Sequence, residues 1–99
     1  MNRKDAFSFC YKLEELILPD NVNYIGECLC ENCKSLKRVV LSDKIRDIRI
    51  ASFYGCESLV KVKLPARLQT LSDNAFSHTQ RLQKLDLPNT VYWIGRECF

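Results

Sequence analysis

Apolar residues recur along this chain with a period of 23 residues, and no insertion interrupts the register. One column of equivalent positions holds Phe7, Cys30, Phe53, Phe76 and Phe99. The other columns are Cys10/Cys33/Cys56/Thr79, Leu13/Leu36/Leu59/Leu82, Leu16/Val39/Val62/Leu85, Leu18/Leu41/Leu64/Leu87, Pro19/Ser42/Pro65/Pro88, Val22/Ile45/Leu68/Val91 and Ile25/Ile48/Leu71/Ile94. A period of this length is typical of a solenoid, in which each coil buries its apolar face only against its neighbours.

Each repeat contains a short alternating run that predicts a β-strand. In the first repeat Leu16 and Leu18 lie on one side of an extended segment, and Glu15 and Ile17 lie on the other. Equivalent strands are expected at 13–18, 36–41, 59–64 and 82–87. Strands stacked one coil apart, at about 4.8 Å, form a parallel sheet along one side of the solenoid.

The rest of each repeat closes the coil. Proline at the end of three of the four strands lacks a backbone N–H and ends the pairing there. A second short extended stretch is expected at 22–25, and a short helical turn at 26–33, where the alternation is lost. The predicted fold is α/β and β-rich: a right-handed solenoid with a parallel sheet on its concave face and short helical turns on its convex side.

The repeats define one domain over residues 1–99, with units at 6–28, 29–51, 52–74 and 75–97 and a fifth unit beginning at 98–99. Solenoids need atypical capping repeats that shield their end faces from water, and neither end of this sequence shows a polar cap. We therefore expect a segment of a longer array. The alternative is end-to-end self-association through the uncapped ends.

Net charge and hydropathy indicate which classes of binding partner to expect. Fifteen Lys and Arg against twelve Asp and Glu leave a net charge of +3, which does not indicate nucleic-acid binding. No apolar run approaches the roughly 18 residues of a membrane span, and the first residues do not resemble a secretory signal. We expect neither nucleic acid nor membrane insertion, and a protein partner instead.

The repeat resembles a known family. Its pattern, Ala-Phe-x-x-Cys-x-x-Leu-x-x-Val-x-Leu-Pro-x-x-Val-x-x-Ile-Gly, is similar to the BspA-like leucine-rich repeat. The first repeat carries it as Ala6-Phe7, Cys10, Leu13, Leu16, Leu18-Pro19, Val22 and Ile25-Gly26. The second repeat departs most, with Cys30 in place of Phe and Ser42 in place of Pro. The resemblance implies a non-catalytic, cell-surface or secreted adhesin-like protein that binds host, matrix or partner proteins. The alternative is an intracellular leucine-rich repeat scaffold.

Six cysteines in 99 residues permit three interpretations. Cys10, Cys33 and Cys56 share a column with Thr79, so the column favours a small, weakly polar side chain that donates to the backbone of the neighbouring coil. We expect these thiols to be reduced, buried and metal-free. Disulfides between adjacent rungs are one alternative, although stacked side chains point in parallel. A zinc or redox element built on Cys28, Cys30 and Cys33 is the other.

No arrangement in the sequence predicts catalysis. His78 is the only histidine, and it occupies a column that also holds Phe9, Asn32 and Gly55, which indicates a variable, exposed position. The three glycines are isolated, so no phosphate-binding loop is present. We expect no enzymatic activity, no cofactor and no metal.

The outward strand positions define the candidate binding surface. They form two neighbouring rows, Glu15, Arg38, Lys61 and Lys84 beside Ile17, Val40, Lys63 and Asp86. Four of these eight residues are basic, so the concave face is predicted to contact an acidic or glycosylated protein. The alternative is a sheet whose charges are only solvated. A second candidate surface is the exposed aromatic pair Tyr92 and Trp93.

Overall fold

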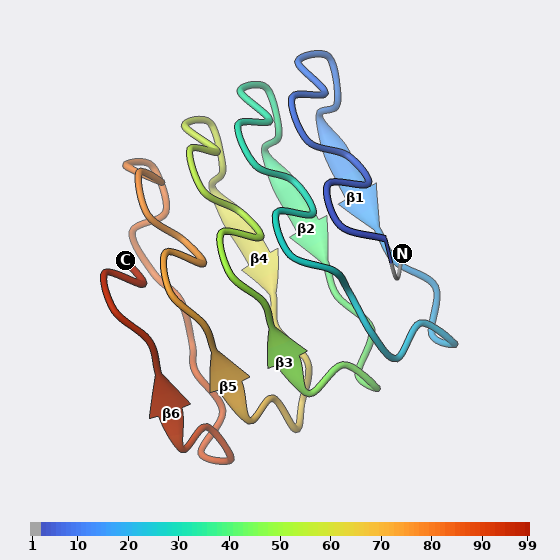
Figure 1. Ribbon diagram of the computed structural model, residues 1–99, viewed down its shortest axis with the longest axis vertical. Helices are drawn as coiled ribbons and strands as arrows, with labels where there is room; N and C mark the ends of the chain where they lie inside the picture. Colours follow the sequence, from blue (N-terminus) through green and yellow to red (C-terminus); the bar gives the residue numbers. More distant parts are fainter. Residues whose placement is uncertain (1–2) are drawn as a thin grey trace.

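The computed structural model describes residues 3–99 as a stack of coils (Figure 1). Coils one to four here mean residues 6–28, 29–51, 52–74 and 75–97. Six short strands form two parallel sheets. The major sheet has the order β1 (Glu15–Ile17), β2 (Arg38–Val40) and β4 (Lys61–Lys63). The minor sheet has the order β3 (Asp47–Ile48), β5 (Thr70–Leu71) and β6 (Trp93–Ile94).

The major sheet confirms the predicted register. Glu15 pairs with Arg38, which pairs with Lys61, in parallel and 23 residues apart at each step. The alternating sequence produces this arrangement. The middle residue of each strand (Leu16, Val39 and Val62) packs on the core, while the residues on either side of it point outward.

The second extended stretch of the repeat forms a sheet of its own. Ile48 pairs with Leu71 and Leu71 with Ile94, again in parallel. Strands are found here in coils two to four, at the second half of the predicted stretch, so coils two and three are joined by β-ladders on two sides.

The predicted helical turns are not found: residues 3–99 contain no helix. Two columns explain this, because their residues have positive φ and an α-helix cannot pass through them. They are Asp5/Cys28/Ala51/Asn74/Glu97, with φ from 50 to 62°, and Phe9/Asn32/Gly55/His78, with φ from 57 to 73°. Alternate N–H groups donate to the next coil instead, as Asp5, Phe7 and Phe9 do to carbonyls 2.8–3.0 Å away. The α/β assignment is therefore wrong, and the fold is all-β.

The core is a set of ladders that run along the stack. The rings of Phe53 and Phe76 stack at 5.3 Å between centroids, and Phe76 and Phe99 at 6.0 Å. Cys30 takes the equivalent position in coil two, so the aromatic ladder is interrupted beside Phe7. Phe53 and Phe76 are the largest of the fully buried side chains, so they contribute strongly to the apolar core.

Coil four departs from the repeat at one place. The strand predicted at 82–87 is not formed, and in Figure 1 the chain next to β4 has no arrow. The coil stays attached to coil three through β6 and through the Phe53 N–H, which donates to the Ala75 carbonyl at 2.9 Å. Lys84 would lie directly opposite Lys61, which already faces Arg38 on its other side, and it would lack the compensating carboxylate that Glu15 supplies to Arg38, so charge repulsion disfavours this pairing. In this segment Leu87 is 38% exposed, whereas its equivalent Leu41 is 1% exposed.

Candidate functional site

The outward side chains of the major sheet form a continuous surface, here called the major-sheet face. It comprises Glu15, Ile17, Arg38, Val40, Lys61 and Lys63. All are exposed except Val40, which is half-buried, and the strand register places them side by side in two rows. The structure thus brings together six of the eight predicted residues. Lys84 and Asp86 are also exposed, but they lie on the unpaired segment of coil four.

Ion pairs divide the basic patch that the sequence predicted. Arg38 Nη1 lies 3.1 Å from Glu15 Oε2, so its charge is compensated by the neighbouring strand. Lys63 Nζ lies 3.9 Å from Asp43 Oδ1. Within residues 3–99, Lys61 and Lys84 have no ion-pair partner. The uncompensated positive charge is therefore concentrated at the boundary between coils three and four.

Asp43 was not anticipated as part of this surface. It lies in the turn after β2, where its Oδ1 accepts a hydrogen bond from the Ala66 N–H at 2.9 Å. This bond holds the carboxylate above the end of β4, within reach of Lys63. The sequence signal is the position itself, one residue after the proline column, because a carboxylate there can bond a backbone N–H of the next turn.

A cleft opens where coil four separates from β4, here called the coil-four cleft. Its volume is about 530 Å³. It is lined by Val60, Lys61, Val62, Lys63, Leu64, Pro65, Ala66, Lys84, Asp86 and Pro88. A second cavity, of about 510 Å³, is lined by Leu85 and Leu87 of the same segment and by Phe99. The segment at 82–87 therefore contributes Lys84 and Asp86 to the first cavity and its leucines to the second.

Two members of the cysteine column, Cys33 and Cys56, are buried and form the predicted hydrogen bonds between coils, whereas Cys10 is half-buried, so the prediction that it is buried is wrong. Cys33 Sγ donates to the Phe7 carbonyl at 3.0 Å, and Cys56 Sγ donates to the Cys30 carbonyl at 3.1 Å, in each case across to the preceding coil. Thr79 differs, because its hydroxyl donates within its own coil to the Phe76 carbonyl at 2.7 Å. All six cysteines are free thiols in the structure.

Thiol acidity differs sharply within this cluster. The Cys30 thiol donates to the Cys33 sulfur, which lowers the pKa of Cys33 to about 7 although burial opposes the effect. The same hydrogen bond, followed by burial, raises the pKa of Cys30. Burial is the main cause that raises the pKa of Cys56 to about 12. Because the Cys33 and Cys56 side chains have no exposed surface, these thiols are shielded from reagents in solvent while the protein is folded.

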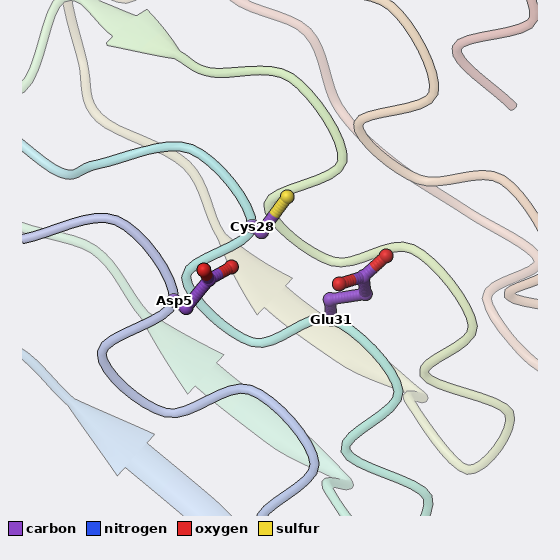
Figure 2. A group of neighbouring side chains, drawn as sticks. All are labelled: Asp5, Cys28 and Glu31. Carbon is purple, nitrogen blue, oxygen red and sulfur yellow. The ribbon is translucent and has the colours of Figure 1, made fainter.

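The zinc alternative of Cys28, Cys30 and Cys33 is not supported by the geometry. Cys30 and Cys33 are buried in the core, whereas Cys28 lies half-buried on the outer turn. Cys28 instead approaches Asp5 and Glu31, and the three ligand atoms lie within 4.8 Å of one another (Figure 2). Three donors leave a tetrahedral zinc site one ligand short. Burial, then Glu31 and Asp5, raise the pKa of the Cys28 thiol, which must lose its proton to bind a metal.

The remaining candidates lie apart from the major-sheet face. His78 is exposed on its turn, where its ring meets the edge of Tyr54 at 5.2 Å, while the ladder thiols of Cys33 and Cys56 are in the core. Tyr92 and Trp93 are 74% and 48% exposed at β6. Within residues 3–99 no helix has the length and apolar character needed to cross a membrane.

Comparison with known proteins agrees with the repeat pattern. The sequence profile of the BspA type leucine rich repeat region matches residues 3–99 in six copies. A search of curated proteins finds no significant match.

Three solved structures are similar to this chain. A leucine-rich repeat protein from Bacteroides ovatus is 32% identical over 98% of this chain, with a TM-score of 0.94. The T. pallidum leucine-rich repeat protein is 35% identical over 95%, with a TM-score of 0.91. A leucine-rich cell surface protein from Faecalibacterium prausnitzii is 25% identical over 94%, with a TM-score of 0.86.

The chain spans only part of those proteins: 25%, 44% and 28% of their lengths, in the same order. The repeat register, the parallel sheet and the profile match over nearly the whole sequence lead to one assignment. The chain belongs to the BspA-type leucine-rich repeat family.

Proposed function

We propose that this chain is a non-catalytic protein-interaction module that binds partner proteins through the major-sheet face, the face predicted to be concave. The observation that carries the proposal is the pair of exposed rows held in register by the parallel strands. A leucine-rich repeat is a non-enzymatic fold that typically mediates protein interactions, and extended sheet faces are the usual binding surfaces of solenoids.

The proposed partner is an acidic or glycosylated protein. Support comes from Lys61 and Lys84, whose charges have no ion-pair partner within residues 3–99, and from Lys63 beside them. Charges at the rim of a binding surface act over about 8 Å at physiological salt and set encounter rate and orientation more than affinity. Ile17 and Val40 provide apolar contact at the other end of the face.

The proposed setting is the cell surface or the extracellular space, with adhesion to host, matrix or other partner proteins. The similarity to a leucine-rich cell surface protein from F. prausnitzii supports this setting. An intracellular scaffold is the second candidate. Surface labelling of intact cells with an antibody to this chain distinguishes the two, because an intracellular scaffold is labelled only after lysis.

We also propose that the end coils are covered by further repeats, or by end-to-end contact with a second copy. The chain spans between 25% and 44% of the relatives' lengths. Apolar side chains are exposed at both ends of the stack, including Phe9 and Tyr11 at one end and Tyr92 and Phe99 at the other. Sedimentation at several concentrations tests the second arrangement directly.

The binding proposal is tested by charge reversal on and off the face. Lys61→Glu with Lys63→Glu is expected to slow association with an acidic extracellular protein by about tenfold or more at low salt. The matched control is Lys12→Glu with Arg81→Glu, which changes the same charge at exposed positions outside the sheet. Arg49 is less suitable as a control because it contacts the Tyr24 ring at 5.4 Å. Equal losses in both variants would contradict the proposal, since charge alone would then explain binding.

A further inference from the structure

We infer that the coil-four cleft binds an extended, acidic segment of a partner protein, which adds to the edge of β4 as a parallel strand. The inference rests on the proposed function and specifies how the partner engages. Three independent features of the cleft support it: unpaired backbone groups along β4, the alternation of side chains on that strand, and the excess of positive charge around it.

The backbone of β4 has a free edge. In coil two, the Lys37 carbonyl accepts from the Val60 N–H at 2.9 Å, and the Leu41 N–H donates to the Lys63 carbonyl at 3.0 Å. The equivalent groups in coil three are the Val60 carbonyl and the Leu64 N–H. Neither has a hydrogen-bond partner within residues 3–99, and both residues line the cleft.

An unpaired strand edge of this kind is a template for another strand. The five residues from Val60 to Leu64, four steps along the strand, extend over about 13 Å at the rise of a parallel strand. An added strand supplies an N–H to the Val60 carbonyl and a carbonyl to the Leu64 N–H, so it completes the ladder that coil four leaves open. Its direction is parallel to β4, as in every other pair of this sheet.

The side chains of β4 fix the sequence pattern of the occupant. Lys61 and Lys63 point outward, whereas Val62 and Leu64 point inward and are half-buried, less covered than the leucines of coil two. An added strand therefore places acidic residues beside Lys61 and Lys63 and aliphatic residues over Val62 and Leu64. The preferred pattern is acidic–aliphatic–acidic–aliphatic.

Charge favours the same occupant. Lys61, Lys63 and Lys84 line the cleft with a single carboxylate, that of Asp86. Coil four is a poor partner for β4, because its Lys84 would add a basic side chain beside Lys61, which already faces Arg38, with no carboxylate to compensate it. An acidic strand reverses that repulsion, just as Glu15 compensates Arg38 at 3.1 Å on the neighbouring pair. The cleft therefore discriminates between strands by charge and by alternation together.

The hydrogen-bond pattern also predicts which backbone N–H groups of the added strand bond to β4. In each strand pair of the major sheet, the outward residues of the strand that comes later in the sequence form backbone hydrogen bonds to the earlier strand. For example, the Val40 carbonyl of β2 accepts from the Leu18 N–H at 3.0 Å. The acidic residues of the occupant correspond to those outward positions. Their N–H groups face β4, whereas the N–H groups of the aliphatic residues face away.

The test uses this protein and three synthetic peptides with blocked ends. One contains Glu-Val-Glu-Leu, the second has N-methyl groups on the two glutamates, and the third has them on the two aliphatic residues. We expect the first and third to bind, and the second to bind at least about tenfold more weakly, because it loses two backbone hydrogen bonds. Amide exchange followed by NMR is expected to slow by about tenfold or more at Leu64 when the first peptide is bound.

Equal binding of the second and third peptides, or an unprotected Leu64 amide in the complex, would overturn strand addition. Absence of binding by the Glu-Val-Glu-Leu peptide would overturn it as well. None of these results would contradict the proposed function. That function is tested separately by reversing the charges of Lys61 and Lys63, which measures binding of a whole partner protein at the major-sheet face independently of backbone pairing.

Discussion

Replacing Cys56 with serine is expected to change how stability depends on pH. The Cys56 thiol is fully buried, and burial, followed by the nearby Cys33, raises its pKa from 9.0 to about 12. A raised thiol pKa means that the folded state retains the proton more strongly than the unfolded state. The resulting stabilisation is complete below pH 9.0 and is lost as the pH rises toward about 12.

The magnitude follows from proton linkage. Each pH unit between the two pKa values lowers the free energy of unfolding by about 1.4 kcal/mol per thiol, so the loss at about pH 10.5 is about 2 kcal/mol. Serine does not ionise in this range, and its hydroxyl can donate to the same Cys30 carbonyl that accepts from Cys56 at 3.1 Å. Cys56→Ser is therefore expected to lose about 2 kcal/mol less than the parent protein over this pH interval.

Urea unfolding at a series of pH values between 7.5 and 10.5, chosen to bracket the onset of the effect at about pH 9, measures the difference. The remaining side chains are common to both proteins, so the difference between the two profiles isolates the Cys56 thiol together with its coupling to Cys33. The matched control is Thr79→Ser, which alters the same column without removing a thiol. If the parent protein and Cys56→Ser show parallel pH profiles above pH 9, the Cys56 thiol ionises equally in both states and the reasoning is wrong.

Three further predictions concern the ladders and turns. Gly55→Ala is expected to cost about 2 kcal/mol, because φ is 73° there and a Cβ collides with the Asn32 carboxamide oxygen; urea unfolding measures it. Phe76→Ala is expected to cost about 3–5 kcal/mol by the same assay, because the ring is fully buried between two stacked neighbours. Thiol titration of denatured, unreduced protein is expected to find all six cysteines free; a stable bridge, or zinc retained in native mass spectrometry, would contradict this.

The parts of the fold that repeat could be predicted from the sequence. A fixed period assigns each residue to a column, and a column shares one environment because every coil packs on a copy of itself. This is why the register Glu15, Arg38 and Lys61 could be predicted, together with the inward leucines and the cysteine ladder. The donation of the Cys33 and Cys56 thiols to the preceding coil also follows from the column rule.

The outer turns were mispredicted because their backbone conformation leaves little trace in side-chain polarity. Loss of period-2 alternation at 26–33 is compatible with a helix or with a chain of turns. The deciding feature is positive φ at Cys28 and Asn32, and residues as different as Phe9, Ala51 and Glu97 occupy the same two columns in other coils. A glycine or asparagine at every such position would have predicted turns, but only some coils carry one.

The candidate binding surface could be predicted only in part from the columns of the repeat. A column describes what each coil has in common, whereas the coil-four cleft arises from a difference between neighbouring coils. Arg38 and Lys61 are both basic, yet Arg38 is bonded to Glu15 and Lys61 faces Lys84. Arg38 and Lys61 nevertheless pair, because Glu15 compensates Arg38, so we expect that an uncompensated pair such as Lys61 and Lys84 is what disfavours strand closure and leaves an edge for a partner.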